Sequence, residues 1–336
     1  MNKKAFEIQF NWIFILVAGA AILLFFASVI VKQKNISETS TRATVLKSID
    51  AIITGASVTI DTTKIENIPS SEIDVGCNRV AIGSLSSDVS KQYQNLILFS
   101  PSSIKGSKFI WQTAAFSVPF RAINLLYIAS PQVRYIIIGS STLAIDINKS
   151  MPADLKKEFY QSIPSIKNEN NYKIRLIVFE NIDMSGINLK NLEKMPDLDV
   201  TAIKVNGDNE KGTINFYQKN GDSWMSKGSS SYIQKSSLIG AVYTDTLDAY
   251  QCNMQNVFSR LNLVTKIYAD RTNELIKTTS QLSCRQFYSN ALAELNKISA
   301  ASSSFNKNNV DAIVDSAKSL ANINNDAKTY SCPLLY

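Results

Sequence analysis

The sequence contains no histidine among its 336 residues, and this absence limits its chemistry more than any residue present. Histidine is the commonest general base in enzymes and a very common metal ligand. Without it, Ser-His-Asp catalysis, Cys-His catalysis and imidazole-based metal sites are all excluded. A serine nucleophile in this chain would need a lysine or a carboxylate as its base.

Cysteine is scarce, with four residues that lie far apart in the sequence: Cys77, Cys252, Cys284 and Cys332. Their separation fits neither a C-x-x-C redox pair nor a zinc site. An even number of distant cysteines predicts disulfides, which persist in an oxidising compartment outside the cytoplasm.

Basic clusters and glycine-rich phosphate loops are also missing. The formal net charge is +7 at pH 7, but the 35 Lys and Arg residues are spread along the chain. We therefore expect no nucleic-acid partner. Neither G-x-G-x-x-G nor G-x-x-x-x-G-K-[ST] occurs, so we expect no cofactor. A hydrophobic content of 45% is enough for one large or two ordinary folded domains.

One long apolar run is present near the N-terminus. From Trp12 to Val31 there are 20 residues without a charge, and a helix of this length covers the ~30 Å hydrocarbon core of a bilayer. Trp12 on one side and Lys32 and Lys34 on the other are typical of membrane borders. A buried helix of a soluble protein is the alternative, but the run is too uniformly apolar for one. We predict a cytoplasmic tail and signal anchor over residues 1–34, with the lipid bilayer as partner of residues 12–31.

The orientation of this anchor does not follow from charge alone. Lys3 and Lys4 before the span are balanced by the basic residues after it. The cysteines and two glycosylation sequons, at Asn35 and Asn148, favour an extracytoplasmic C-terminal part at the cell membrane. We predict a single-pass protein and two candidate glycosylation sites.

Two N-terminal segments resemble known families. Gln9–Phe14 (QFNWIF) resembles the start of uncharacterised single-pass membrane proteins of small-genome archaea, a resemblance that implies an anchor and no activity. Lys3-Lys4-Ala5 is similar to the class III signal of archaeal type IV pilins, although Glu7 lies only two residues past Ala5. This second resemblance implies a filament subunit that is processed near Ala5.

The first part after the anchor is expected to be a helix followed by strands. Residues 35–56 carry apolar side chains at helical spacing and predict a juxtamembrane helix. Residues 57–131 form a β-rich segment of short strands, with Ser100–Gly106 as a hairpin loop.

Residues 132–245 are expected to form an α/β domain. Arg134–Ile138 reads as a strand that is apolar on both faces, as in a covered parallel sheet. We predict a helix at Ala153–Phe159, a hairpin around Asn220-Gly221 and a last strand at Ser237–Tyr243. The fold class is α/β, with a Rossmann-like three-layer sheet and an antiparallel addition.

Residues 246–336 predict a C-terminal three-helix bundle, whose geometry favours one disulfide pairing. In an up-down-up bundle Cys284 and Cys332 lie at the same end, whereas Cys252 is ~40 Å away along the first helix. Cys284 can therefore pair with Cys332, which leaves Cys252 for Cys77. A break in the first helix, around Asp270, would reopen the other pairings.

Three carboxylates, Asp146, Glu180 and Asp245, each follow a predicted strand, where α/β sheets gather ligands. Together they could hold Mg²⁺ or serve as weak catalytic candidates. The simpler alternative is that they are loop acids and helix caps, and Thr244-Asp245-Thr246 just ahead of a helix suits an N-cap. We therefore expect no bound metal.

No catalytic constellation emerges from these patterns. The leading hypothesis is a non-enzymatic, membrane-anchored cell-envelope protein that binds or organises envelope proteins or glycans. Trp111 and Trp224 could contribute a glycan-binding surface, although aromatic residues in strands usually pack in a core. The alternatives are an envelope enzyme, namely a metal- or carboxylate-dependent hydrolase or transferase, and a pilin-like surface filament subunit.

Overall fold

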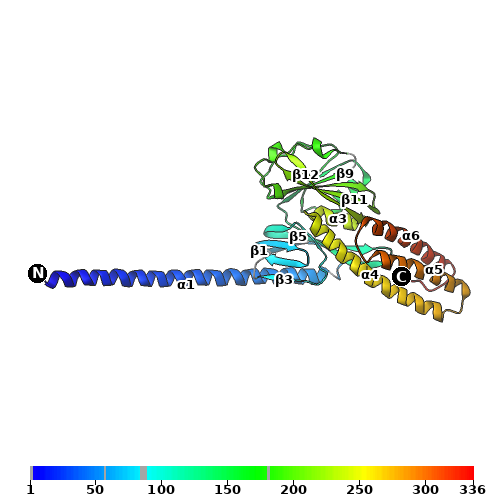
Figure 1. Ribbon diagram of the computed structural model, residues 1–336, viewed down its shortest axis with the longest axis horizontal. Coiled ribbons are helices and arrows are strands. Elements are labelled where there is room, and N and C mark those ends of the chain that lie inside the picture. Colours follow the sequence, from blue (N-terminus) through cyan, green and yellow to red (C-terminus); the bar gives the residue numbers. More distant parts are fainter. Residues whose placement is uncertain (1–2, 57, 84–88, 180–181) are drawn as a thin grey trace.

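The computed structural model describes residues 3–56, 58–83, 89–179 and 182–336 of a mixed α/β protein. A long N-terminal helix leads into a folded part that holds two six-stranded sheets and several C-terminal helices (Figure 1). The coarse architecture predicted from the sequence is thus confirmed.

Helix α1 (Lys3–Ala56) joins the predicted anchor and the juxtamembrane helix without a break. Its last turns pack on the first sheet, where Val45 and Ile49 are buried. The polar stretch before them is supported as a helix by Glu38, which pairs with basic residues four positions away on each side. About 20 Å of helix therefore separates the apolar run from the sheet.

The first sheet has the strand order β3-β2-β1-β5-β6-β4 and is mostly antiparallel. Its strands are β1 (Thr63–Gly76), β2 (Arg79–Ile82), β3 (Ser90–Gln92), β4 (Leu98–Phe99), β5 (Ser103–Ser117) and β6 (Arg121–Ala129). Alternate residues of β6 face opposite sides: Leu126 and Ile128 pack towards α1, and Leu125 and Tyr127 face the large central core.

The second sheet has the order β12-β11-β10-β9-β7-β8. Its strands are β7 (Val133–Ile138), β8 (Lys156–Tyr160), β9 (Lys173–Phe179), β10 (Val200–Gly207), β11 (Lys211–Asn220) and β12 (Ser223–Ile233). Four strands are parallel, and β11 and β12 form the antiparallel addition. Helix α2 (Thr142–Ser150) contributes to the core on one face, and the other face packs with a segment that contains the 3₁₀ helices η1 (Met184–Gly186) and η2 (Lys190–Leu192).

Helix α3 (Gln234–Tyr243) lies between the two sheets, as Figure 1 shows. All residues from Ser236 to Tyr243 are buried. Tyr243 stacks on Tyr127 of the first sheet with ring centroids 5.4 Å apart and lies 5.9 Å from the ring of Tyr135 in the second. The two sheets therefore share one hydrophobic core rather than forming separate bodies.

The C-terminal helices are α4 (Leu247–Thr278), α5 (Leu282–Ala301) and α6 (Lys307–Thr329). Helix α5 packs against both of the others, and α6 also contacts β11 and β12. Cys284 is joined to Cys332 within this region, and Cys252 of α4 is joined to Cys77 beside the first sheet. This is the pairing predicted from the length and direction of the helices.

Three local predictions were wrong. Ala153–Phe159 is not a helix, because residues from Lys156 pair with β7 as an edge strand, which overrides their helix propensity. Ser237–Tyr243 is helix α3 rather than a strand, since periodicity cannot distinguish a short, fully buried run of either kind. Ser100–Gly106 is not a hairpin loop, because its second half begins β5 and pairs with β1.

Candidate functional site

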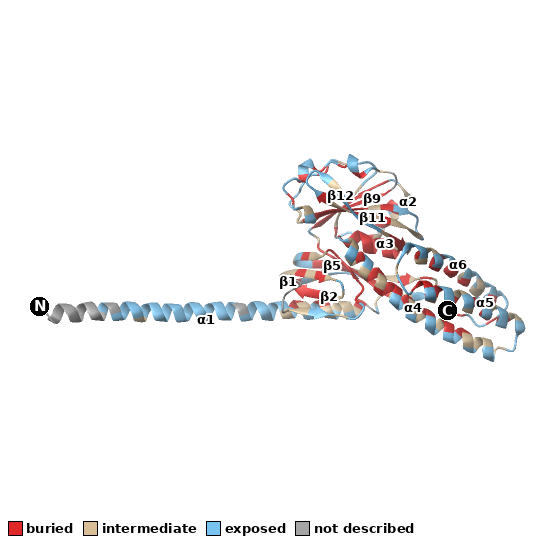
Figure 2. Ribbon diagram, in the orientation of Figure 1, coloured by how far each residue is buried: buried red, intermediate tan, exposed pale blue. Residues whose placement is uncertain are grey.

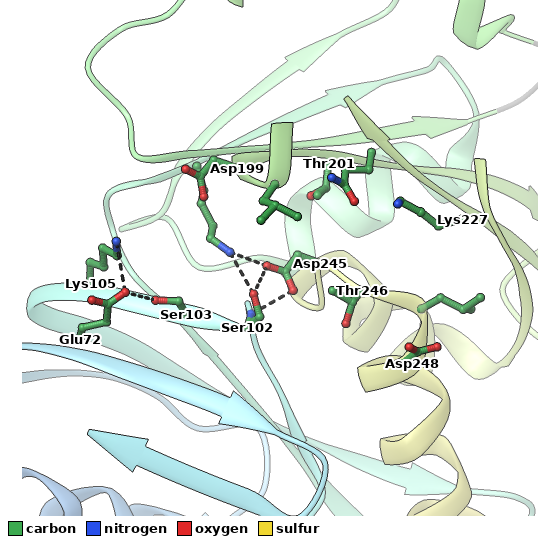
Figure 3. Close-up of a pocket in the computed structure, with 14 residues that line it drawn as sticks. Glu72, Ser102, Ser103, Lys105, Asp199, Thr201, Lys227, Asp245, Thr246 and Asp248 are labelled. Carbon is green, nitrogen blue, oxygen red and sulfur yellow. Dashed lines mark hydrogen bonds and ion pairs between the residues drawn. The ribbon is translucent and has the colours of Figure 1, made fainter. Parts of the chain in front are cut away.

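A polar pocket of about 490 Å³ opens between the two sheets at the start of α4. Its walls come from β1 and β5 of the first sheet, from the starts of β9 and β10 in the second, and from β12 (Figure 3). Seven charged residues line it: Glu72, Lys105, Lys173, Asp199, Lys227, Asp245 and Asp248. Its volume is in the range of small-molecule sites.

A buried ion pair forms the base of this pocket. The Nζ atom of Lys173 lies 2.5 Å from the Oδ2 atom of Asp245, and their side chains are 9% and 7% exposed. Ser102 donates from its backbone N–H and its hydroxyl to the two Asp245 oxygens, each at 2.9 Å, and accepts from Lys173 at 3.2 Å (Figure 3). The first sheet, the second sheet and the α3–α4 junction therefore meet at one ion pair.

Arg175 holds Asp245 in position through the backbone of the α3–α4 junction. Its buried guanidinium donates to the carbonyls of Ala241, Val242 and Thr244, which end α3. Burial lowers the pKa of Arg175 to about 10, and the nearby Asp245 carboxylate opposes this change. The group therefore remains charged at neutral pH.

The contacts of Ser102 do not make it a strong nucleophile. A serine–lysine pair needs a neutral amine to accept the hydroxyl proton. Here Lys173 donates to Asp245 as one partner of an ion pair, so its nitrogen has no free lone pair. The Asp245 carboxylate accepts the Ser102 hydroxyl but is a weak base. This geometry positions Ser102 and binds polar groups better than it activates a hydroxyl.

Two acidic residues of the pocket, Glu72 and Asp199, differ in their partners. Glu72 lies 3.1 Å from Lys105 and accepts a hydrogen bond from Ser103. Burial opposes its ionisation, but these two partners outweigh burial and hold the pKa of Glu72 below its usual range. The Asp199 side chain has no hydrogen bond or ion pair with any residue that the structure describes, and burial raises its pKa, although Lys173 and Lys105 oppose this change at longer range. Asp199 is therefore a half-buried carboxyl group without a direct partner.

Lys227 reaches the pocket through an irregularity in β12. The register with β11 shifts between Phe216 and Tyr217, where Gly228 and Ser226 are the opposing residues, so Lys227 is the extra residue of a β-bulge. Gly228 has φ +110°, and a Cβ atom there would lie 2.9 Å from Leu247 at the pocket wall. A bulge with a glycine next to it thus directs the lysine towards the pocket.

The structure brings only one of the three sequence-predicted carboxylates into this pocket. Asp245 lies there, and the neighbouring Thr246 rather than Asp245 is the N-cap of α4. Asp146 lies on α2, and Glu180 lies outside the described residues. Among the described residues, no three His, Cys, Asp or Glu side chains come together as a metal site requires. The three-carboxylate site as a whole stays a prediction.

Other sequence-predicted residues lie away from the pocket. Asn35 and Asn148 both fall within helices, α1 and α2, and their glycosylation stays a prediction. Trp111 is 6% exposed in one core and Trp224 packs against another, so these residues form no exposed aromatic surface.

Sequence reasoning missed Lys173, Ser102, Asp199 and Lys227. One signal could have identified the first: every residue of β9 is buried, including Lys173 and Arg175. Two basic residues in an otherwise apolar strand indicate buried polar partners elsewhere. The other three belong to loops, strand ends and a bulge, which carry no comparable pattern.

Comparisons with known proteins identify no relative of this chain. No protein-family model, curated protein sequence or solved structure matches the chain. The resemblance of the N-terminal segment therefore stays a prediction, and the function has to be argued from the site.

Proposed function

We propose that this chain is a single-pass, membrane-tethered, extracytoplasmic protein that binds a polar ligand in the inter-sheet pocket and does not catalyse a reaction on it. The observation that carries this proposal is a mixed-charge pocket on a fold that continues directly into an apolar helix. A membrane-anchored receptor for a small molecule or for a group on an envelope component has this arrangement.

Support for the tether comes from the apolar side chains of α1. The helix is long and apolar enough to cross a membrane, and its apolar residues face outwards on all sides, with Leu23 71% and Leu24 72% exposed (Figure 2). Water is a poor environment for such a surface, whereas lipid is a suitable one. The helical link after it sets the height of the folded part above the bilayer.

Support for the extracytoplasmic side comes from the two disulfides. Disulfides are rare in reducing compartments, and the described part of the chain contains no free cysteine. The soluble part of the protein accordingly belongs outside the cytoplasm.

The tether and its orientation are tested by protease treatment of intact cells. We expect the protease to remove the folded part and leave a short protected N-terminal fragment. Deletion of residues 1–34 should release a soluble protein. Protection of the folded part until lysis would reverse the topology, and persistence of the truncated form in salt-washed membranes would show a second membrane-binding surface.

The binding role is tested against an envelope hydrolase, which is the second candidate because the Ser102 hydroxyl lines the pocket beside Lys173 and Asp245. An active serine should react with a fluorophosphonate probe, and Ser102→Ala should abolish that labelling. We expect no labelling of Ser102 in the full-length protein. Labelling that is lost in Ser102→Ala and retained in the matched control Ser103→Ala would establish the enzyme instead.

A further inference from the structure

The charges of the inter-sheet pocket divide into satisfied and unsatisfied groups. Lys173 is paired with Asp245, and Lys105 is paired with Glu72. Asp248 lies in the first turn of α4, where the helix dipole stabilises a carboxylate. These five residues have their charge compensated within the protein, so a ligand gains least by contacting them.

Two charged groups remain, of opposite sign and on different strands or loops. Asp199 lies in η3 (Asp197–Asp199), directly before β10, and Lys227 lies in the β12 bulge. Neither side chain has a direct hydrogen bond or ion pair with the residues that the structure describes, although Lys173 and Lys105 act on Asp199 at longer range. Lys227 is exposed and free to contact a ligand. A charged group without a direct partner beside a cavity can form a charge-assisted contact with a ligand group of the opposite sign.

Two polar, uncharged residues of the second sheet also line the pocket. They are Thr201 on β10, which lies between Asp199 and Lys227 in Figure 3, and Gln218 on β11. Thr201 and Gln218 are opposite each other in the antiparallel β10–β11 ladder. Hydroxyl and amide groups at this position suit a ligand with polar atoms between its charged ends.

Building on the proposed binding function, we infer that this pocket recognises a small zwitterion whose ammonium group contacts Asp199 and whose carboxylate contacts Lys227. Free amino acids and short peptides both present these two groups. The mixed charge disfavours a simple dianion or dication, because one end of either would meet a group of like sign.

The test is calorimetric titration of the full-length protein in nanodiscs with ω-amino acids of increasing chain length. Alkylamines and carboxylates of the same lengths serve as singly charged probes. We expect one chain length to bind about 10- to 100-fold more tightly than either singly charged analogue, as two charge-assisted contacts imply. Glycylglycine and triglycine distinguish short peptides from free amino acids as the ligand. A peptide backbone can also form hydrogen bonds with Thr201 and Gln218, so a peptide should then bind more tightly than an ω-amino acid of equal length.

Variants assign each end of the zwitterion. Asp199→Asn should reduce the affinity to that of the carboxylate analogue, and Lys227→Gln should reduce it to that of the amine analogue. Asp154→Asn and Lys194→Gln are matched controls on exposed residues outside the pocket and should change nothing.

Several outcomes overturn this assignment. An amine, a carboxylate or an uncharged compound that binds as tightly as the best zwitterion, with loss of binding in a pocket variant, rejects the ligand class and leaves the binding function standing. If no compound of the series binds while the protease test still shows an external folded part, only the assignment of a zwitterionic ligand is rejected. Labelling of Ser102 by the fluorophosphonate rejects the proposed function independently of both.

Discussion

The central strands of the two six-stranded sheets differ in how much of their surface is buried. In the second sheet every residue of β7 and β9 is buried, whereas β1 of the first sheet carries exposed or half-exposed side chains along most of its length. Since apolar burial is the main stabilising contribution, β1 gains less from core packing than β7 and β9 do.

The first sheet is instead attached to the rest of the protein by specific polar and covalent links. Cys77 is bonded to Cys252 of α4, and Asn256 one turn further along donates to Asn78 and to the carbonyl of Leu96. The second sheet thus depends mainly on core packing, whereas the first sheet is also attached by cross-links to α4.

The largest effect is expected from removing the cross-link of the first sheet. The Cys77–Cys252 disulfide spans 175 residues and Cys284–Cys332 spans 48. Loop-closure entropy predicts a loss of about 5 kcal/mol in unfolding free energy for Cys77→Ser with Cys252→Ser, and about 4 kcal/mol for the other pair. Urea unfolding monitored by circular dichroism measures both. A larger loss for Cys284→Ser with Cys332→Ser would contradict the view that the first sheet depends more on its cross-link.

The buried ion pair is the second link between the sheets. Lys173→Met leaves the Asp245 carboxylate buried without its cation, and this should cost about 3–5 kcal/mol in unfolding free energy. The combined change of Lys173→Met and Asp245→Leu removes both charges and should cost clearly less than the single one. A double variant that is less stable than Lys173→Met would show that the Asp245 side chain stabilises the fold even without its lysine partner, which contradicts the expected cost of an unpaired buried carboxylate.

Close packing between α3 and the first sheet gives the third prediction. A Cβ atom at Gly240 would lie 2.7–2.9 Å from the ring of Phe99, which is fully buried in β4. We expect Gly240→Ala to lower the unfolding free energy by about 1–3 kcal/mol through overpacking. Gly55→Ala is the control, since no atom lies within 4 Å of a Cβ there and alanine favours the helix. Thermal unfolding compares the two, and equal midpoints would show that Phe99 moves aside freely.

The smallest effect concerns Asp199 and the pH. Burial raises the folded-state pKa of Asp199 above its unfolded value of about 3.9. The folded protein therefore binds this proton more tightly than the unfolded chain, so stability falls as the pH rises from the unfolded pKa through the folded pKa. Asp199→Asn should remove this loss and raise the unfolding free energy at pH 7 by about 0.5 kcal/mol. Denaturant titrations of both proteins from pH 3 to pH 7 measure it, and a less stable variant at pH 7 would mean that Asp199 has a stabilising partner.

Much of the fold was predictable because its signals are local. The apolar run from Trp12, the hairpin at Asn220-Gly221 and the α4 pattern each arise from neighbouring residues, and each lies in the expected element of the structure. The strand at Lys156–Tyr160 and the helix at Gln234–Tyr243 were not predictable in this way. Their conformations depend on β7 and on the two sheets around α3, which the local sequence does not contain.

The pocket likewise combines one residue that the sequence predicted with residues that depend on the tertiary structure. Asp245 was a candidate from the sequence, but its partners Ser102 and Lys173 come from segments 143 and 72 residues away. The sequence by itself determined an apolar helix, the elements around it, the absence of imidazole chemistry and, through helix length, the disulfide pairing. Only the tertiary structure decided which charges meet, because an ion pair, a bulge and a carboxylate without a direct partner are defined by groups brought together from distant parts of the chain.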